Sequence, residues 1–149
     1  MISQKCQYAL RAVFELAKHS GEAGHITIGQ IAENQAIPPR FLEVILGQLK
    51  QAGFVESRRG SEGGYRLSRH PAALSVGEVM RFVEGPLSPV GCITGDAEDK
   101  CELRGTCVFE PMWRRVKQAV SDIYDNTTFQ DLIEQEARMR TTYAPAYAI

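Results

Sequence analysis

The sequence predicts a mainly α-helical chain with one small β-hairpin and a long helix suited to dimerisation near its C-terminus. Three observations lead to this fold class. Apolar residues recur at helical spacing in the first 51 residues, glycines separate two short strand-like runs after them, and a heptad-like apolar seam follows Pro111. The sequence has no internal repeats, and strands and helices do not alternate as a parallel sheet requires.

Composition and charge limit the functional classes. The chain has 149 residues, of which 44% are hydrophobic, and a net charge of -1. Residues 1–70 hold 9 basic and 6 acidic side chains, whereas residues 71–149 hold 8 and 12, so an anionic partner should meet the first half. No signal peptide and no apolar run of about 18 residues are present. We expect a cytoplasmic protein with no membrane partner.

The first three predicted elements are helices. The first runs from Ser3 to about His19; Lys5, Arg11, Glu15 and Lys18 lie outside its apolar stripe, which consists of Cys6, Ala9, Leu10, Val13, Leu16 and Ala17. Thr27 and Gln30 form a capping box that opens a short helix to about Gln35. Pro39 suits the first position of a third helix, which ends near Gln51 and buries Leu42, Ile45, Leu46 and Leu49.

The remaining elements are a hairpin and three more helices. The hairpin strands are Phe54–Arg58 and Tyr65–Leu67. Ser75 and Glu78 form a second capping box, which opens a helix to about Val83. After an irregular loop, a helix from Pro111 to about Asn126 carries a seam for a partner helix, made of Trp113, Val116, Val120 and Ile123. A short helix from Phe129 to about Arg138 precedes a tail expected to be mobile.

This order of elements describes a winged helix-turn-helix. We expect a DNA-binding domain over residues 1–84, a cysteine-bearing sensor loop over 85–110, and a dimerisation helix with a C-terminal tail over 111–149. In a helix-turn-helix, the second helix enters the major groove of double-stranded DNA. Arg40 could there donate two hydrogen bonds to guanine, and Glu43 could accept one from cytosine. The alternative is that both are ordinary solvated residues, because a fold does not establish a function.

The predicted hairpin strengthens the case for DNA. Arg58 and Arg59 flank its glycine-rich tip, where arginine can read the width of a minor groove and bind phosphate. A solvated charge run remains the alternative, since Glu56 and Glu62 are interleaved. The full candidate set for DNA contact is Thr27, Pro39, Arg40, Glu43, Lys50, Arg58, Arg59, Gly60 and Tyr65.

Three stretches, "ISQKCQYALRA", "IPPRFLEVILGQLKQAGFVESRRGSEGGYRLS" and "LSVGEVMRFVEGPL", resemble the Rrf2 family of bacterial transcription regulators. The resemblance spans Ile2 to about Glu134, and "RGSEGGY" is its most specific motif. It implies that Arg59 enters the minor groove and that the start of the third helix meets the major groove. It also implies a homodimer formed by a long helix. We therefore expect a repressor of an inverted-repeat operator.

Three of the four cysteines lie in the stretch "GCITGDAEDKCELRGTCVFE". Cys92, Cys101 and Cys107 are separated by eight and five residues, which is not the paired-hook spacing of a zinc site. A loop can wrap around an iron–sulfur cluster with irregular spacing. Two other hypotheses remain open: the cysteines form a disulfide sensor, or they are small hydrophobic residues.

The family resemblance bears on the cysteine loop, because cluster-binding members use three cysteines of the same loop as ligands. It implies a site of Cys92, Cys101, Cys107 and, as fourth ligand, Glu110, which occupies the position of a histidine in some members. A [2Fe–2S] cluster is favoured over [4Fe–4S]. Other members use a carboxylate near the N-terminus, but Gln7 stands at that position here, and Cys6 is expected in the core.

The leading hypothesis is a regulator controlled by this cluster. One alternative is the same fold regulated by thiol oxidation, a small molecule or a protein partner without a cluster. Another is a winged-helix interaction module that does not bind DNA, which salt-dependent operator binding would exclude. We expect no enzyme, because His19, His25 and His70 have no nucleophile at motif spacing.

Overall fold

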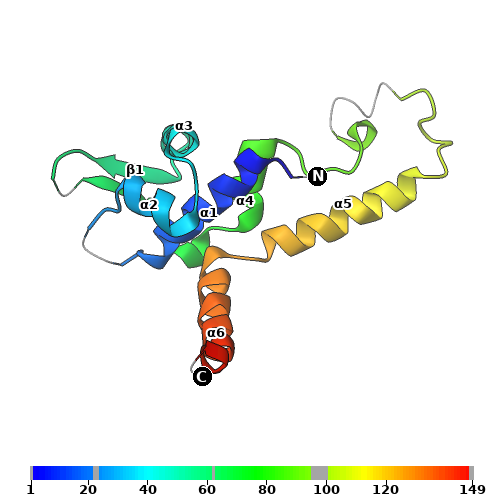
Figure 1. The fold of residues 1–149 in the computed structure, drawn as a ribbon. Helices are drawn as coiled ribbons and strands as arrows, with labels where there is room; N and C mark the ends of the chain where they lie inside the picture. The colour runs from blue at the N-terminus through cyan, green and yellow to red at the C-terminus, as the bar shows by residue number, and fades with distance from the viewer. Residues whose placement is uncertain (1, 22–23, 62, 95–100, 148–149) are drawn as a thin grey trace.

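A computed structural model describes residues 2–21, 24–61, 63–94 and 101–147. It confirms the predicted mainly α fold with a hairpin wing (Figure 1). The described elements, in chain order, are α1 Gln4–Lys18, α2 Ile28–Gln35, α3 Pro39–Gln51, β1 Val55–Arg58, β2 Gly64–Leu67, the 3₁₀ turn η1 Pro71–Ala73, α4 Val76–Glu84, the 3₁₀ turn η2 Gly91–Ile93, α5 Glu110–Asp125 and α6 Phe129–Tyr147. No helix in the described ranges is long and apolar enough to span a membrane.

Local sequence signals fix where the first helices begin. The Ser3 hydroxyl accepts a hydrogen bond from the Cys6 backbone nitrogen at the start of α1. Both bonds of the predicted capping box form between Thr27 and Gln30 at the start of α2. Pro39 occupies the first turn of α3, where its missing N–H group costs nothing. The signals at Thr27 and Pro39 were predicted from the sequence, whereas Ser3, predicted as the start of the first helix, is its N-cap.

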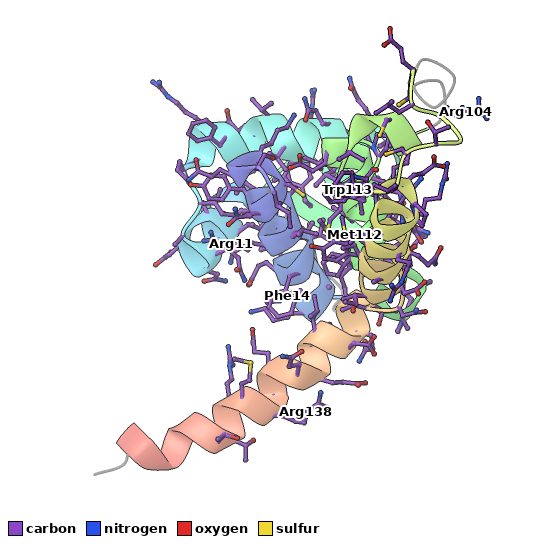
Figure 2. The ribbon with its side chains drawn as sticks, turned by 90° about the vertical axis from the view of Figure 1, so that its right-hand side faces the viewer. Arg11, Phe14, Arg104, Met112, Trp113 and Arg138 are labelled. Carbon is purple, nitrogen blue, oxygen red and sulfur yellow. The ribbon has the colours of Figure 1, made fainter. Side chains whose placement is uncertain are left out.

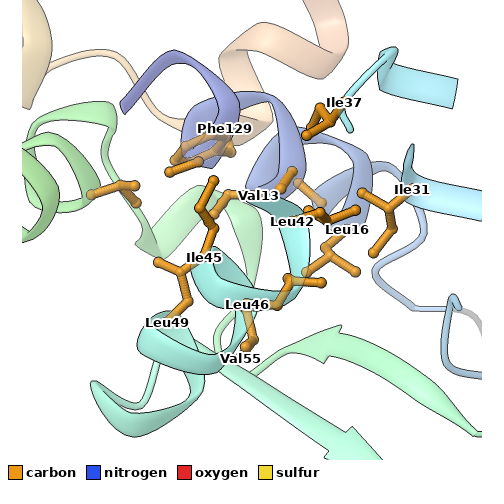
Figure 3. Packing of buried hydrophobic residues seen from close by; sticks show 14 of the residues in the cluster. Val13, Leu16, Ile31, Ile37, Leu42, Ile45, Leu46, Leu49, Val55 and Phe129 are labelled. Carbon is orange, nitrogen blue, oxygen red and sulfur yellow. The ribbon is translucent and has the colours of Figure 1, made fainter. Parts of the chain in front are cut away.

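The hydrophobic core lies where α1 and α3 cross and receives side chains from α2, β1, α4 and α6. The four predicted α3 residues are all buried. Phe129, at the start of α6, is 0% exposed and packs in the same cluster as Val13, Leu42 and Ile45 (Figure 3). A residue from the C-terminal part of the chain therefore completes the core of the winged half.

Glu15 corrects the predicted surface of α1. Its side chain was expected outside the buried stripe, yet it is only 1% exposed. Asn34 and Gln35, at the end of α2, donate hydrogen bonds of 2.8 and 2.7 Å to its two oxygens, and Lys18 lies 3.0 Å away. These partners offset the cost of burying a carboxylate. Helical periodicity in α1 alone cannot reveal partners that another helix supplies.

Two further predictions need correction. Ser75 caps α4 as expected, but the Glu78 carboxylate pairs with Arg69 at 2.5 Å instead of returning to the cap. The predicted mobile tail is helical as far as Tyr147, while residues 148–149 lie outside the described ranges. No glycine or proline ends α6 at Arg138, and a 3.0 Å ion pair between Glu136 and Arg140 supports the turn across that point.

Candidate functional site

The outward face of α3 presents the predicted major-groove residues. Pro39, Arg40, Glu43 and Lys50 are all exposed, because the core residues of α3 point the other way. Val44, which the sequence analysis did not select, is 58% exposed on this face. An apolar side chain there can contact the methyl group of thymine in the major groove. The available signal was an aliphatic residue outside the buried stripe.

Gly47 lies one turn after Val44 in α3. A Cβ atom at this position would meet no atom within 4 Å, so packing within the chain does not require glycine. Glycine inside a helix costs roughly 0.5–1 kcal/mol relative to alanine. The helix backbone is therefore open to another molecule at this point.

The wing is held against the start of α2 by backbone hydrogen bonds. The nitrogens of Ile26 and Tyr65 each donate to the other residue's carbonyl, at 2.9 and 2.7 Å. Gly64 has a φ of 144°, and a Cβ there would lie 2.3 Å from the Ile26 oxygen. At Gly63, a Cβ would lie 2.4 Å from the Arg58 oxygen. The two glycines before the tyrosine of "RGSEGGY" are thus required by close backbone approach.

The predicted wing residues take different positions around this junction. Arg58, Arg59 and Gly60 are exposed at the tip, and Thr27 is exposed at the N-cap of α2. Tyr65 is half-buried, and it holds the wing through its backbone hydrogen bonds with Ile26. Glu62 lies outside the described residues.

The cysteine loop forms a pocket of about 80 Å³ at the start of α5. Its lining includes all four predicted ligands, namely Cys92, Cys101, Cys107 and Glu110. All four cysteines of the chain are free thiols. No three His, Cys, Asp or Glu side chains in the described ranges are gathered closely enough to hold one metal ion. The donor set is therefore assembled around one space, but it is not closed into a ligand shell.

Basic side chains from α5 shape this pocket. Arg114 lines it, its Nε donates a 2.9 Å hydrogen bond to Glu110 Oε1, and its Nη2 lies 2.9 Å from the same oxygen in an ion pair. Lys117 Nζ donates to the Ile93 carbonyl at 3.1 Å, which ties the turn that carries Cys92 to α5. Figure 2 shows Arg104 on the loop and Trp113 on the adjacent helix; both also line the pocket. Arg114 was not among the predicted site residues, although its spacing from Glu110 is that of an i,i+4 helical pair.

Cys6 lies apart from this pocket. It is 0% exposed in the core, as expected. Burial raises the pKa of its thiol to about 11, and the nearby Glu84 carboxylate adds to this shift. Cys6 therefore stays protonated at neutral pH and suits a packing role.

The predicted seam of α5 is divided between different surroundings. Trp113 lines the cysteine pocket, whereas Val116 and Val120 line a cavity of about 530 Å³ between α4 and α5. Ile123 is 66% exposed. A neighbouring row with steps of four, three and four is exposed throughout and consists of Met112, Val116, Ala119 and Ile123. No residue of α5 is buried in the isolated chain.

The far end of α5 is fastened to the winged half. Val76 donates a 2.8 Å backbone bond to Thr127, and Phe129 donates one of 3.1 Å to Leu74. Figure 1 shows the hairpin and the cysteine loop at opposite ends of the molecule, with α5 extending towards the loop. The loop is thus connected to the winged half through α5.

Comparisons with known proteins agree with this arrangement. The Rrf2 family model, described as "Iron-dependent Transcriptional regulator", matches residues 2–135. The HTH-type transcriptional regulator CymR of Bacillus subtilis is 38% identical over 143 residues, which cover 93% of this chain and 96% of CymR. The HTH-type transcriptional regulator IscR of Erwinia tasmaniensis is 30% identical, with 91% and 79% covered.

Solved structures give the same result. "The Structure of CymR (YrzC) the Global Cysteine Regulator of B. subtilis" matches with a TM-score of 0.74 and 36% identity, covering 91% of this chain and 97% of that one. The structure "T. potens IscR" matches with a TM-score of 0.73 and 32% identity, covering 91% and 88%. These relatives are transcription regulators and not enzymes, as expected for this chain. The chain belongs to the Rrf2 family of transcriptional regulators.

Proposed function

We propose that the chain is a homodimeric repressor of an inverted-repeat operator and that an iron–sulfur cluster in the cysteine loop, of the [2Fe–2S] type, controls it. The observation that carries this proposal is the pocket at the start of α5, where three free thiols and Glu110 share one lining. Thiolates are the usual ligands of such clusters. The family description "Iron-dependent" supports the same assignment.

The DNA-binding half of the proposal rests on exposed side chains held on rigid elements. Arg40, Glu43 and Val44 offer a donor, an acceptor and an apolar group on the outward face of α3. Arg59 stands at the tip of the wing, which is held in place by backbone hydrogen bonds between Tyr65 and Ile26, just before α2. Together these features suit major-groove and minor-groove contact on one half-site.

The proposal of a homodimer rests on α5. An amphipathic helix without a single buried residue is unusual for an isolated domain, and a row of exposed apolar side chains at heptad spacing suits a partner helix. We propose that Met112, Val116, Ala119 and Ile123 form the seam with a second copy. Trp113 and Val120 then serve the two pockets of their own subunit.

Cys92, Cys101, Cys107 and Glu110 are the residues that would hold the cluster. When bound, the cluster supplies sensitivity to oxidants and to iron supply. The loop side chains would close around it, because they surround the pocket without forming a ligand shell. Cys92 is held to α5 through Lys117, so closure would bring the other cysteines towards a fixed point.

The cysteine pocket would be coupled to DNA binding through α5. This helix has 16 residues and thus spans about 24 Å, with the pocket at its start and the fastened joint at its end. A change in how its start is held biases the relative placement of the two winged halves in a dimer. That bias is a population shift between DNA-binding geometries.

The test is anaerobic purification followed by absorption spectra and analysis of iron and sulfide. Cys101→Ala is expected to abolish iron binding, whereas the control Cys6→Ala, in the core, keeps it. Operator binding is then measured for the cluster-bound and cluster-free proteins against a random duplex at several salt concentrations. Equal affinity of the two forms for the operator would contradict cluster control, and equal affinity for the two duplexes would contradict a specific operator.

Thiol regulation without a cluster is the second candidate. It is favoured by the exposure of Cys92 and by two relatives, one described as "the Global Cysteine Regulator" and one solved as the "Staphylococcus aureus CymR oxidized form" at a TM-score of 0.66. If reconstitution with iron and sulfide fails, mass spectrometry after mild oxidation tests this function. Oxidation of a loop cysteine that changes operator affinity would support it.

A further inference from the structure

We infer that Arg114 is a positioning residue, which holds the Glu110 carboxylate at the cysteine pocket so that one of its oxygens can reach iron. This inference rests on the proposed function. Both side chains line the pocket, and Arg114 contacts Glu110 Oε1 through a hydrogen bond from Nε and an ion-pair contact of Nη2, each at 2.9 Å. The guanidinium is thus directed at the residue that differs most in chemistry from the three sulfur ligands.

The geometry of the pair leaves room for a metal bond. Arg114 Nε and Nη2 both lie 2.9 Å from the same atom, Glu110 Oε1, so these two contacts leave Oε2 outside this fork. A carboxylate needs only one oxygen to ligate iron. Glu110 is the first residue of α5 and its side chain is 29% exposed, so without a partner it would sample several rotamers. Arg114, one helical turn later, limits it to one direction.

The charges in the pocket lining also favour a bound carboxylate at Glu110. As ligands of the proposed cluster, the three cysteine sulfurs and Glu110 would carry negative charge, and Arg114 and Arg104 place positive groups in the same lining. Partners of metal-bound carboxylates typically contribute 10–100-fold to metal affinity. A lysine would keep the charge of Arg114 but not its two-nitrogen fork. Variants can therefore separate orientation from charge.

The experiment measures how fast the reconstituted dimer loses its cluster to a fixed concentration of chelator, followed by absorbance and iron content. Arg114→Gln is expected to speed this loss about 10–100-fold. Arg114→Lys should fall between Arg114→Gln and the unaltered protein. Arg115→Gln is the matched control, because Arg115 is the next residue of the same helix, is exposed and does not line the pocket. Thermal unfolding of the cluster-free proteins should be the same for all three variants.

A double-variant comparison shows whether Arg114 acts through Glu110. If it does, Glu110→Gln combined with Arg114→Gln loses the cluster no faster than Glu110→Gln alone. Additive effects would overturn the positioning role, as would an Arg114→Gln rate equal to that of Arg115→Gln, or an Arg114→Lys rate equal to that of the unaltered protein. An unaltered protein that binds no cluster would overturn the proposed cluster control and this inference together. A normal cluster in the unaltered protein with unchanged loss in Arg114→Gln would overturn this inference alone.

Discussion

Arg81 binds Asp125 through two nitrogens, at 2.5 and 2.9 Å, and so joins α4 to the end of α5. The hydrogen bond from Arg81 lowers the pKa of the Asp125 carboxyl, which keeps the pair charged in mildly acidic solution. Gly77 lies beneath the pair, because a Cβ on it would be 2.1 Å from Asp125 Oδ1. The ion pair can take this position only over a residue without a side chain.

Gly77→Ala should displace Asp125 and weaken this joint while leaving the fold intact, since the atoms in the way are side-chain ends. Arg81 and Asp125 are 40% and 43% exposed, so the free energy of unfolding should change by less than about 1 kcal/mol. If the proposed cluster controls the chain, the ratio of operator affinities between the cluster-bound and cluster-free forms should shrink severalfold. Denaturant unfolding measures the change in stability, and operator titrations measure the coupling; Arg81→Gln serves as a parallel variant. If neither variant changed the coupling, the joint would be excluded as the contact that transmits it.

Gly64→Ala should destabilise the wing, because the new Cβ would meet the Ile26 carbonyl, a backbone atom, at a positive φ. We expect a loss of about 2 kcal/mol or more in the free energy of unfolding. Hydrogen exchange should show the largest increase at the amides of Ile26 and Tyr65, which form the bonds at this junction. Normal protection there would show that the wing does not need this glycine.

Gly47→Ala should have opposite effects on folding and on DNA binding. The new methyl group has free space, and alanine favours the helix by roughly 0.5–1 kcal/mol, so the protein should become more stable. If α3 approaches the groove closely at this point, operator affinity should fall. Thermal unfolding and DNA titration measure the two effects; a more stable variant with unchanged affinity would remove Gly47 from the contact surface.

Glu15→Gln should flatten the dependence of stability on acid pH. Burial raises the pKa of Glu15, but hydrogen bonds from Gln35, Asn34 and Lys18 outweigh it and lower the pKa below the usual 4.5. The stabilisation is therefore complete above about pH 4.5 and is lost as the pH falls through the lower folded pKa. Urea unfolding between pH 3 and 7 measures this, with Glu33→Gln, an exposed residue of α2, as the control. Parallel curves for both variants would contradict the role of Glu15.

Iodoacetamide should modify the loop cysteines of the native, cluster-free protein and leave Cys6 unmodified. A thiol with a pKa of about 11 instead of 9.0 holds about a hundredfold less thiolate at pH 8, and burial blocks access as well. Peptide mapping before and after unfolding identifies the labelled positions. Native labelling of Cys6 at a rate similar to Cys92 would contradict the buried position.

Features that depend on neighbours in sequence were predicted well. Thr27 and Gln30 form the capping box of α2, and Leu42 to Leu49 supply the buried face of α3. Each pattern lies within a single helix, so local sequence reveals it. Glu15 was not predicted, since its partners Asn34 and Gln35 come from α2. Val44 could have been selected, because it is an aliphatic residue outside the buried stripe of α3. The pairing of Arg114 with Glu110 follows from local spacing and could have been read from the sequence.

The cysteine site depends both on local spacing and on contacts between distant residues. The spacing of Cys92, Cys101 and Cys107 predicts a loop wrapped around a cluster, which stays a prediction; the three cysteines line one pocket. The contact between Lys117 and the Ile93 carbonyl, which fixes one edge of that pocket, joins residues 24 positions apart. No local pattern predicts such a contact, because it depends on how the loop returns to α5.

The position of Phe129 has a consequence for how the chain folds as it is made. Its ring, 0% exposed, fills the core that α1 and α3 form, yet it is synthesised after the hairpin, the cysteine loop and α5. The winged half should therefore lack a central side chain of its core until α6 has been made, and its final packing should form only then. Competence to bind DNA should thus be acquired late in translation, once the segment that fixes α5 is also present.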